Sequence, residues 1–71
     1  MAIAYFKVEQ KGELSADEAQ KAVGEGAHLV VRTDVQKGKT TIHFAADEQD
    51  ARSADLRSRA TAVKLKDIAK L

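Results

Sequence analysis

The sequence predicts a small α+β domain in which a three-stranded, mainly antiparallel sheet packs against one short and one long helix, in the order β-α-β-β-α. Three short runs in residues 1–46 alternate between apolar and polar residues, which is typical of strands. Ser15 and Glu18 form a capping box after the first run, which marks the start of a helix. From Asp47 onward there is no Gly or Pro, and residues of high helix propensity dominate.

The size and composition allow one domain, spanning residues 1–71, with a thin core. A chain of 71 residues buries only about 60% of the surface that its unfolded form exposes. Thirteen of the hydrophobic residues are Ala, and only 16 are Leu, Ile, Val or Phe. A second chain could therefore complete the core.

The first strand and the first helix follow from local patterns. Residues 2–9 are rich in aromatic and β-branched residues and alternate in polarity, which predicts a strand. In the capping box, the Ser15 hydroxyl accepts from the Glu18 amide, so a short helix is expected at residues 16–23. Gly24 and Gly26 follow directly and predict the end of that helix.

Two further strands are expected at residues 28–35 and 39–46, joined as a β-hairpin by a two-residue loop at Lys37-Gly38. That loop fixes a register in which the numbers of opposed residues add up to 75. One face of the hairpin is then apolar and pairs Leu29–Ala46, Val31–Phe44 and Thr33–Ile42. The other face is mixed and pairs Val30–Ala45, Arg32–His43 and Asp34–Thr41.

A long C-terminal helix is expected from Asp47 onward, with Leu56, Ala60, Val63 and Leu71 on one face. Three residues fit this helix badly, because Asp67 falls on the apolar face while Leu65 and Ile68 fall off it. Alternating polarity at residues 62–66 allows a fourth strand instead, which would give the ferredoxin-like order β-α-β-β-α-β. The lack of a turn residue between Arg57 and Lys64 favours the helix.

The positive charge is concentrated at the C-terminus. Residues 52–71 carry six Lys or Arg and two Asp, a net charge of +4, whereas residues 1–51 carry a net charge of −3. The six cations are the predicted binding residues: Arg52, Arg57, Arg59, Lys64, Lys66 and Lys70. On one straight helix, four of them (Arg52, Arg59, Lys66, Lys70) would form a stripe about 27 Å long. Such a stripe could track phosphates or an acidic protein, or simply lay its methylene stems over the buried face.

No residue is predicted to be catalytic or to bind a cofactor or a metal. The chain has no Cys, and no Ser has a base nearby in the sequence. Both histidines are expected to be solvated on the mixed face of the hairpin, about 13 Å apart, which is too far to share one metal ion. Gly38-Lys39-Thr40-Thr41 resembles the end of a phosphate-binding loop but has Thr33 where that pattern needs Gly.

These observations predict a non-catalytic binding or regulatory module that acts through protein–protein contacts, either as a homodimer or as an inhibitor of a larger partner. The alternative is a nucleic-acid-binding protein that uses Arg52, Arg59, Lys66 and Lys70. A third hypothesis, an enzyme or metal-dependent module, would use His43 with Asp34 or Asp47. We expect a cytoplasmic protein with no cofactor, no small-molecule substrate and no membrane contact.

Overall fold

The computed structural model describes residues 2–36 and 38–70, without the side chains of residues 34–36. It has the predicted α+β class, with an antiparallel sheet and helices in one small domain. The elements follow one another in this order: β1 (Ile3–Lys11), α1 (Ala16–Val23), β2 (Ala27–Gln36), β3 (Lys39–Asp47), the 3₁₀ helix η1 (Ala51–Ser53), α2 (Ala54–Arg59), β4 (Thr61–Val63) and α3 (Leu65–Ala69).

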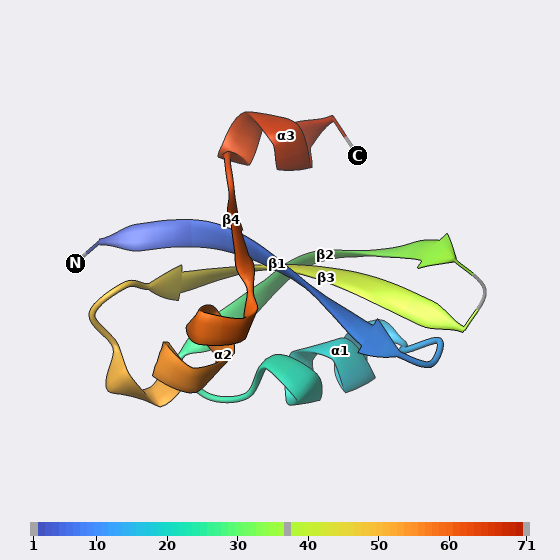
Figure 1. Cartoon of the computed structure of the whole chain (residues 1–71), viewed down its shortest axis with the longest axis horizontal. Coiled ribbons are helices and arrows are strands. Elements are labelled where there is room, and N and C mark those ends of the chain that lie inside the picture. The colour runs from blue at the N-terminus through green and yellow to red at the C-terminus, as the bar shows by residue number, and fades with distance from the viewer. Residues whose placement is uncertain (1, 37, 71) are drawn as a thin grey trace.

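Within the described residues, the sheet has four strands in the spatial order β2-β3-β1-β4, and every neighbouring pair is antiparallel. The prediction of three strands is therefore wrong. The alternative order β-α-β-β-α-β describes the chain up to residue 63, and α3 follows it. β1 lies between β3 and β4, so it is an inner strand (Figure 1).

The helices divide between the two sides of the sheet. In Figure 1, α1 and α2 lie on one side of the strands, whereas α3 lies on the other side, at the far end of β4. Phe6 of β1 and Phe44 of β3 stack at the centre of the core, with their ring centroids 5.5 Å apart. The buried core cluster comes from β1, β2, β3, α1 and α2: Phe6, Ala19, Val23, Ala27, Ile42, Phe44, Ala46 and Leu56. We call the opposite side of the sheet its open face.

The first helix is confirmed to the residue. The Glu18 amide donates to Ser15 Oγ at 3.3 Å, and the Ser15 amide donates to Glu18 Oε1 at 3.1 Å. Gly26 follows in the left-handed region at φ 82°, and a Cβ there would lie 3.0 Å from the Cβ of Arg52. The turn after α1 therefore packs against η1 in a way that only glycine permits without strain.

The β2–β3 hairpin is present, but its predicted register holds only beside the turn. Gln36 pairs with Lys39 as expected, and Lys37 lies outside the described residues. Two irregularities then shift the register, one between Thr33 and Gln36 and one between Leu29 and Val31. Leu29 consequently pairs with Phe44, whereas the prediction paired it with Ala46. A bulge adds an extra residue to one strand. A register derived from the turn alone is therefore correct only between the turn and the first bulge.

The same shifts change which residues share a face. Val31 was expected on the apolar face but pairs with His43 on the open face. Arg32 was expected to face His43 but pairs with Ile42. The predicted environment of His43 is therefore wrong.

The long C-terminal helix is also wrong, because three separate helical segments and a strand take its place. α2 ends at Arg59, and Ala60 is extended at φ −97° and ψ 162°. β4 then pairs with β1 through Thr61, Ala62 and Val63. No glycine is needed at this junction, because no residue there has a positive φ. Pairing with β4 satisfies backbone groups along the edge of β1, which a continuing helix would leave open.

The residues that fitted the long helix badly now lie in α3. Ile68 is buried, Leu65 is 53% exposed, and Asp67 is exposed. Leu71, expected on the apolar face of the long helix, lies outside the described residues.

Candidate binding site on the open face of the sheet

The six predicted binding residues do not form a stripe. Arg52 lies in η1, Arg57 and Arg59 lie in α2, and Lys64 is the N-cap of α3. Lys66 lies within α3, and Lys70 follows its last residue. The straight rod that would align Arg52, Arg59 and Lys66 is absent, because β4 interrupts it. Their role in binding stays a prediction, and four of them fall into two groups by their surroundings.

The first group, Arg52 and Arg57, makes internal contacts around Asp50. Arg52 donates from Nη2 to Asp50 Oδ2 at 2.8 Å and from its backbone amide to Oδ1 at 2.9 Å. These hydrogen bonds, together with the positive charges of Arg52 and Arg57, lower the pKa of Asp50 to about 2.

Arg57 holds the segment between β3 and α2. Its guanidinium donates to the backbone carbonyls of Glu48 and Asp50, and its Nε donates to Ser53 Oγ at 3.0 Å. Ser53 is itself fully buried and donates to the Asp50 carbonyl at 3.3 Å. Carbonyls that a regular helix would satisfy internally are thus satisfied here by one side chain.

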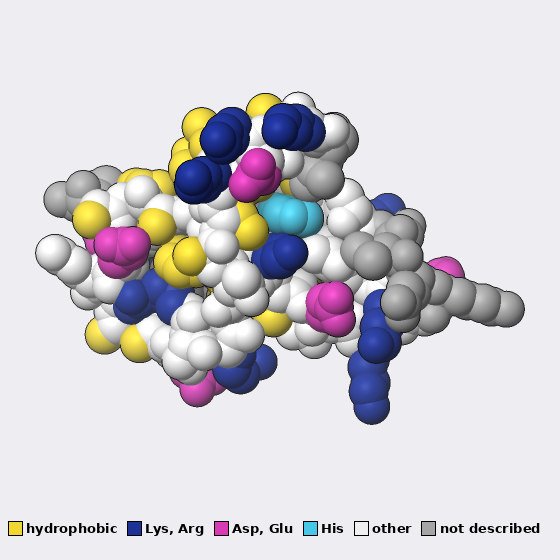
Figure 2. Space-filling model, turned by 45° about the horizontal axis from the view of Figure 1, so that its top comes forward, with side chains coloured by type: hydrophobic (Ala, Val, Ile, Leu, Met, Phe, Trp, Pro, Cys, Tyr) yellow, Lys and Arg dark blue, Asp and Glu magenta, His cyan; other side chains and the backbone are white. Residues whose placement is uncertain are grey.

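The second group lies near β4, where Arg59 lines one hollow together with Lys7 and Lys64 lines another. Lys7 pairs with Thr61 of β4 and with His43 of β3, so it projects from the open face. A groove of about 560 Å³, called here the His43 groove, is lined by Lys7, Val8, Glu9, Thr33, Thr41, His43, Arg59 and Thr61. A smaller hollow of about 460 Å³ is lined by Lys7, Thr61, Ala62, Val63, Lys64 and Asp67. Figure 2 shows basic side chains over α3 and beside a histidine on this face.

His43 is buried in the groove, with only 8% of its surface exposed. Burial lowers its pKa below the ordinary value, and the positive charge of Lys7 lowers it further, while a hydrogen bond with the Val31 backbone partly offsets both effects. Its Nδ1 atom is buried without a hydrogen-bond partner among the described residues. The prediction that His43 is solvated is wrong, whereas His28 is exposed as expected.

Lys7 and Arg59, the two cations of the groove, make only weak contacts with the other side chains that the structure describes. Arg59 Nε lies 3.4 Å from Asp55 Oδ2, and both side chains are mostly exposed, so this pair contributes about 0.3–0.5 kcal/mol. Lys7 has no ion pair or side-chain hydrogen bond within the part of the chain that the structure describes. Both cations are therefore free to meet a ligand at little cost.

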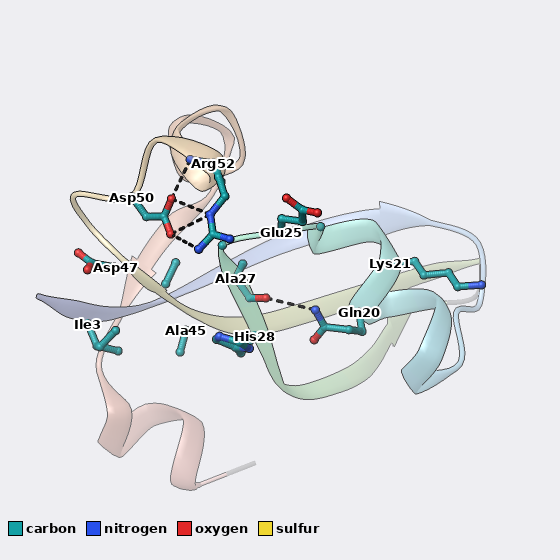
Figure 3. Close-up of a pocket in the computed structure, with 13 residues that line it drawn as sticks. Ile3, Gln20, Lys21, Glu25, Ala27, His28, Ala45, Asp47, Asp50 and Arg52 are labelled. Carbon is teal, nitrogen blue, oxygen red and sulfur yellow. Dashed lines mark hydrogen bonds and ion pairs between the residues drawn. The ribbon is translucent and has the colours of Figure 1, made fainter. Parts of the chain in front are cut away.

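A larger hollow of about 730 Å³ lies where β2 begins and β3 ends (Figure 3). Several of its polar groups bond to one another or to the backbone. Gln20 donates to the Ala27 carbonyl at 3.2 Å and accepts from the Leu29 amide at 2.8 Å, and Asp50 holds Arg52. Gln20, Asp50 and Arg52 of this hollow are therefore already engaged within the chain.

Sequence reasoning missed Lys7 and placed His43 in the wrong surroundings. The groove exists because β1, β3 and the segment from Arg59 to Thr61 lie side by side. The sequence does contain one relevant signal, since Lys7 is the only charged residue within residues 2–8 of the first strand. That signal points to a site only once the fourth strand is known to lie beside Lys7.

The third hypothesis, which combined His43 with an acidic residue, gains no support from this geometry. His43 and Asp47 lie four residues apart on β3, which corresponds to about 13 Å. The side chain of Asp34 lies outside the described residues. Within the described residues, no group of three or more potential metal ligands is close enough to hold an ion.

Over that same part of the chain, none of the helices has the length and apolar character that crossing a membrane requires. Comparison of the chain with protein-family models, with curated proteins and with solved structures finds no match.

Proposed function

We propose that this protein is a small, non-catalytic binding module that acts through protein–protein contacts and docks on an acidic surface of a larger partner. The contact surface comprises the open face of the sheet and α3. The observation that carries this function is the set of weakly held cations around β4, contributed by Lys7, Arg59 and Lys64.

Apolar side chains on the same side support a protein partner. Ile3 of β1 is 51% exposed and shares the open face with Tyr5 and Lys7, and the exposed Leu65 follows Lys64 at the start of α3. Large apolar side chains next to cations are typical of the core and rim of protein interfaces. A nucleic-acid partner would instead need cations aligned along a phosphate backbone, and β4 separates those cations here.

Self-association through this surface is less favourable than binding a different protein. In a two-fold symmetric dimer the same patch meets itself, so the cations of both copies would approach one another. Like charges facing one another across an interface cost several kcal/mol. An acidic surface on a different protein pairs with these cations and avoids that cost.

The test is affinity capture from a nuclease-treated lysate of the producing cell, with the chain immobilised. Lys64→Glu should reduce the recovery of a stoichiometric partner by about tenfold or more, because it reverses a charge in the interface. Lys21→Glu, which makes the same change in charge on α1, should leave recovery unchanged. Equal recovery with both variants would overturn the assignment of this surface.

Sedimentation of the purified chain tests the homodimer directly. We expect a monomer at about 100 μM, well above the dissociation constants of ordinary specific complexes. A dimer that Lys64→Glu dissociates would replace the hetero-partner with a second copy of this chain. A species captured from a parallel untreated lysate but absent from the nuclease-treated one would favour the nucleic-acid alternative.

A further inference from the structure

The His43 groove combines a buried histidine with two cations and three threonine side chains. His43 is more than nine-tenths buried, lines the groove, and has a ring nitrogen without a hydrogen-bond partner among the described residues. Leaving a buried polar atom unpaired costs about 1–3 kcal/mol, and such atoms call for an explanation. The hydroxyl-bearing side chains of Thr33, Thr41 and Thr61 line the same groove.

The charge of the groove suits a single negative group. Lys7 and Arg59 bring two positive charges, Glu9 brings one negative charge, and the lowered pKa of His43 keeps its ring neutral at neutral pH. The sum is close to one positive charge, which matches one carboxylate. A chain of phosphates carries more negative charge than one carboxylate, so it would need more cations and would meet stronger repulsion from Glu9.

From this arrangement we infer that the His43 groove receives the carboxylate of an Asp or Glu side chain of the protein partner, held between Lys7 and Arg59 and hydrogen-bonded by the threonine hydroxyls. The inference rests on the proposed function and specifies the chemical group that the open face recognises. Arg59 exchanges its exposed contact with Asp55 for the carboxylate of the partner, which costs little because that contact is weak.

Binding of the carboxylate also changes the charge balance at His43. The charged residues that line the groove together with His43 are Lys7 and Glu9 from β1 and Arg59 from α2, while Val31 and Thr33 of β2 are uncharged. An added negative charge favours the imidazolium, so the pKa of His43 should rise when the groove is filled. His28 has the same chemistry outside the groove and serves as an internal control.

The experiment is an NMR titration of the full chain that follows the ring Hε1 signals of both histidines. The probes are a short, otherwise uncharged peptide with one central Glu and the same peptide with Gln in its place. We expect the Glu peptide to bind with a Kd of about 10 mM, to shift His43 but not His28, and to raise the pKa of His43. The Gln peptide should do none of these.

Variants identify the residues involved. Lys7→Gln and Arg59→Gln should each weaken binding of the Glu peptide about threefold to tenfold, since each removes one charge-assisted contact. Lys21→Gln on α1 is the matched control and should bind as the unmodified chain does. Equal binding of the two peptides, or no effect of either groove variant, would overturn the inference.

Two further probes separate the alternatives. If a short deoxythymidine oligonucleotide or inorganic phosphate shifts His43 while the Glu peptide does not, the groove binds phosphate, and the carboxylate assignment is wrong. If the Glu peptide leaves His43 unmoved while Lys64→Glu still prevents capture of the partner, this inference falls and the proposed function stands. If the peptide binds as expected but Lys64→Glu and Lys21→Glu capture the partner equally, the proposed contact surface is wrong. The groove would then remain a carboxylate-binding site.

Discussion

Thr40 is the residue that fixes the loop after β1. It is fully buried, and its Oγ1 donates to the Gly12 carbonyl at 2.8 Å and accepts from the Leu14 amide at 3.0 Å. A single hydroxyl thereby satisfies two backbone groups that belong to neither a helix nor a strand. Nothing in the local sequence predicts this, because Thr40 and Gly12 lie 28 positions apart.

Replacing Thr40 with Val should destabilise the protein by about 1–3 kcal/mol. Valine keeps the volume but leaves the Gly12 carbonyl and the Leu14 amide without their partner. Urea unfolding followed by circular dichroism measures the change. Thr61→Val is the control, because Thr61 is exposed and its substitution should shift stability by no more than about 0.5 kcal/mol. Equal effects of the two substitutions would refute the role assigned to Thr40.

At the scale of elements, the local signals were sufficient for α1 and insufficient for the C-terminal segment. The capping box and the glycine stop both act within a few residues, so they specify α1 completely. High helix propensity also indicated the helical character of residues 54–59 and 65–69. Propensity did not reveal where the helix would break, because the competing state is a strand on β1, some 55 residues away in the chain.

The segment between β3 and α2 depends on Arg57 for its shape. Arg57→Met keeps much of the aliphatic stem but removes the hydrogen bonds to the Glu48 and Asp50 carbonyls. We expect a loss of about 1–3 kcal/mol in the free energy of unfolding, since two charge-assisted hydrogen bonds are lost, of which the one to the Asp50 carbonyl is partly buried.

Arg59→Met is the matched control for Arg57→Met. Its guanidinium makes one exposed contact at 3.4 Å, so the free energy of unfolding should change by at most about 0.5 kcal/mol. Thermal unfolding monitored by circular dichroism compares the two variants. If Arg57→Met unfolds at the same temperature as Arg59→Met, the guanidinium of Arg57 does not hold this segment, and it would be available to a partner.

For the whole molecule, the sequence predicted the fold class but not the candidate site. The class follows from the periodic spacing of apolar and polar residues within each segment, which can be read directly from the sequence. The site depends on two things that periodicity does not contain: the bulges that place Val31 beside His43, and the fourth strand that brings Arg59 next to Lys7. The C-terminal segment does carry an excess of positive charge, but the positions of these charges in space could be predicted only from the complete sheet.

The dependence of stability on pH tests the buried state of His43 in the whole molecule. Its pKa is lowered in the folded state, so the unfolded chain binds the proton more readily, and stability falls as the pH drops below about 6.5 toward the folded pKa. Asp50 adds a separate loss at lower pH. Its folded pKa is about 2, so its contribution is present above its ordinary value of 3.8 and is lost as the pH falls from 3.8 to about 2.

Urea unfolding between about pH 7 and pH 5.5 tests the contribution of His43, because Asp50 and Glu18, whose pKa values are lowered in the fold, stay largely ionised there. His43→Gln should flatten the slope of stability against pH there, while His28→Gln, made at an exposed position, is the matched control and should preserve it. Only the slopes are compared, so a difference in baseline stability between the variants does not affect the conclusion. If the His43→Gln chain loses stability as steeply as the unmodified protein, the ring of His43 is not held neutral in the folded state. A carboxylate that binds in the groove would then meet a charged imidazolium.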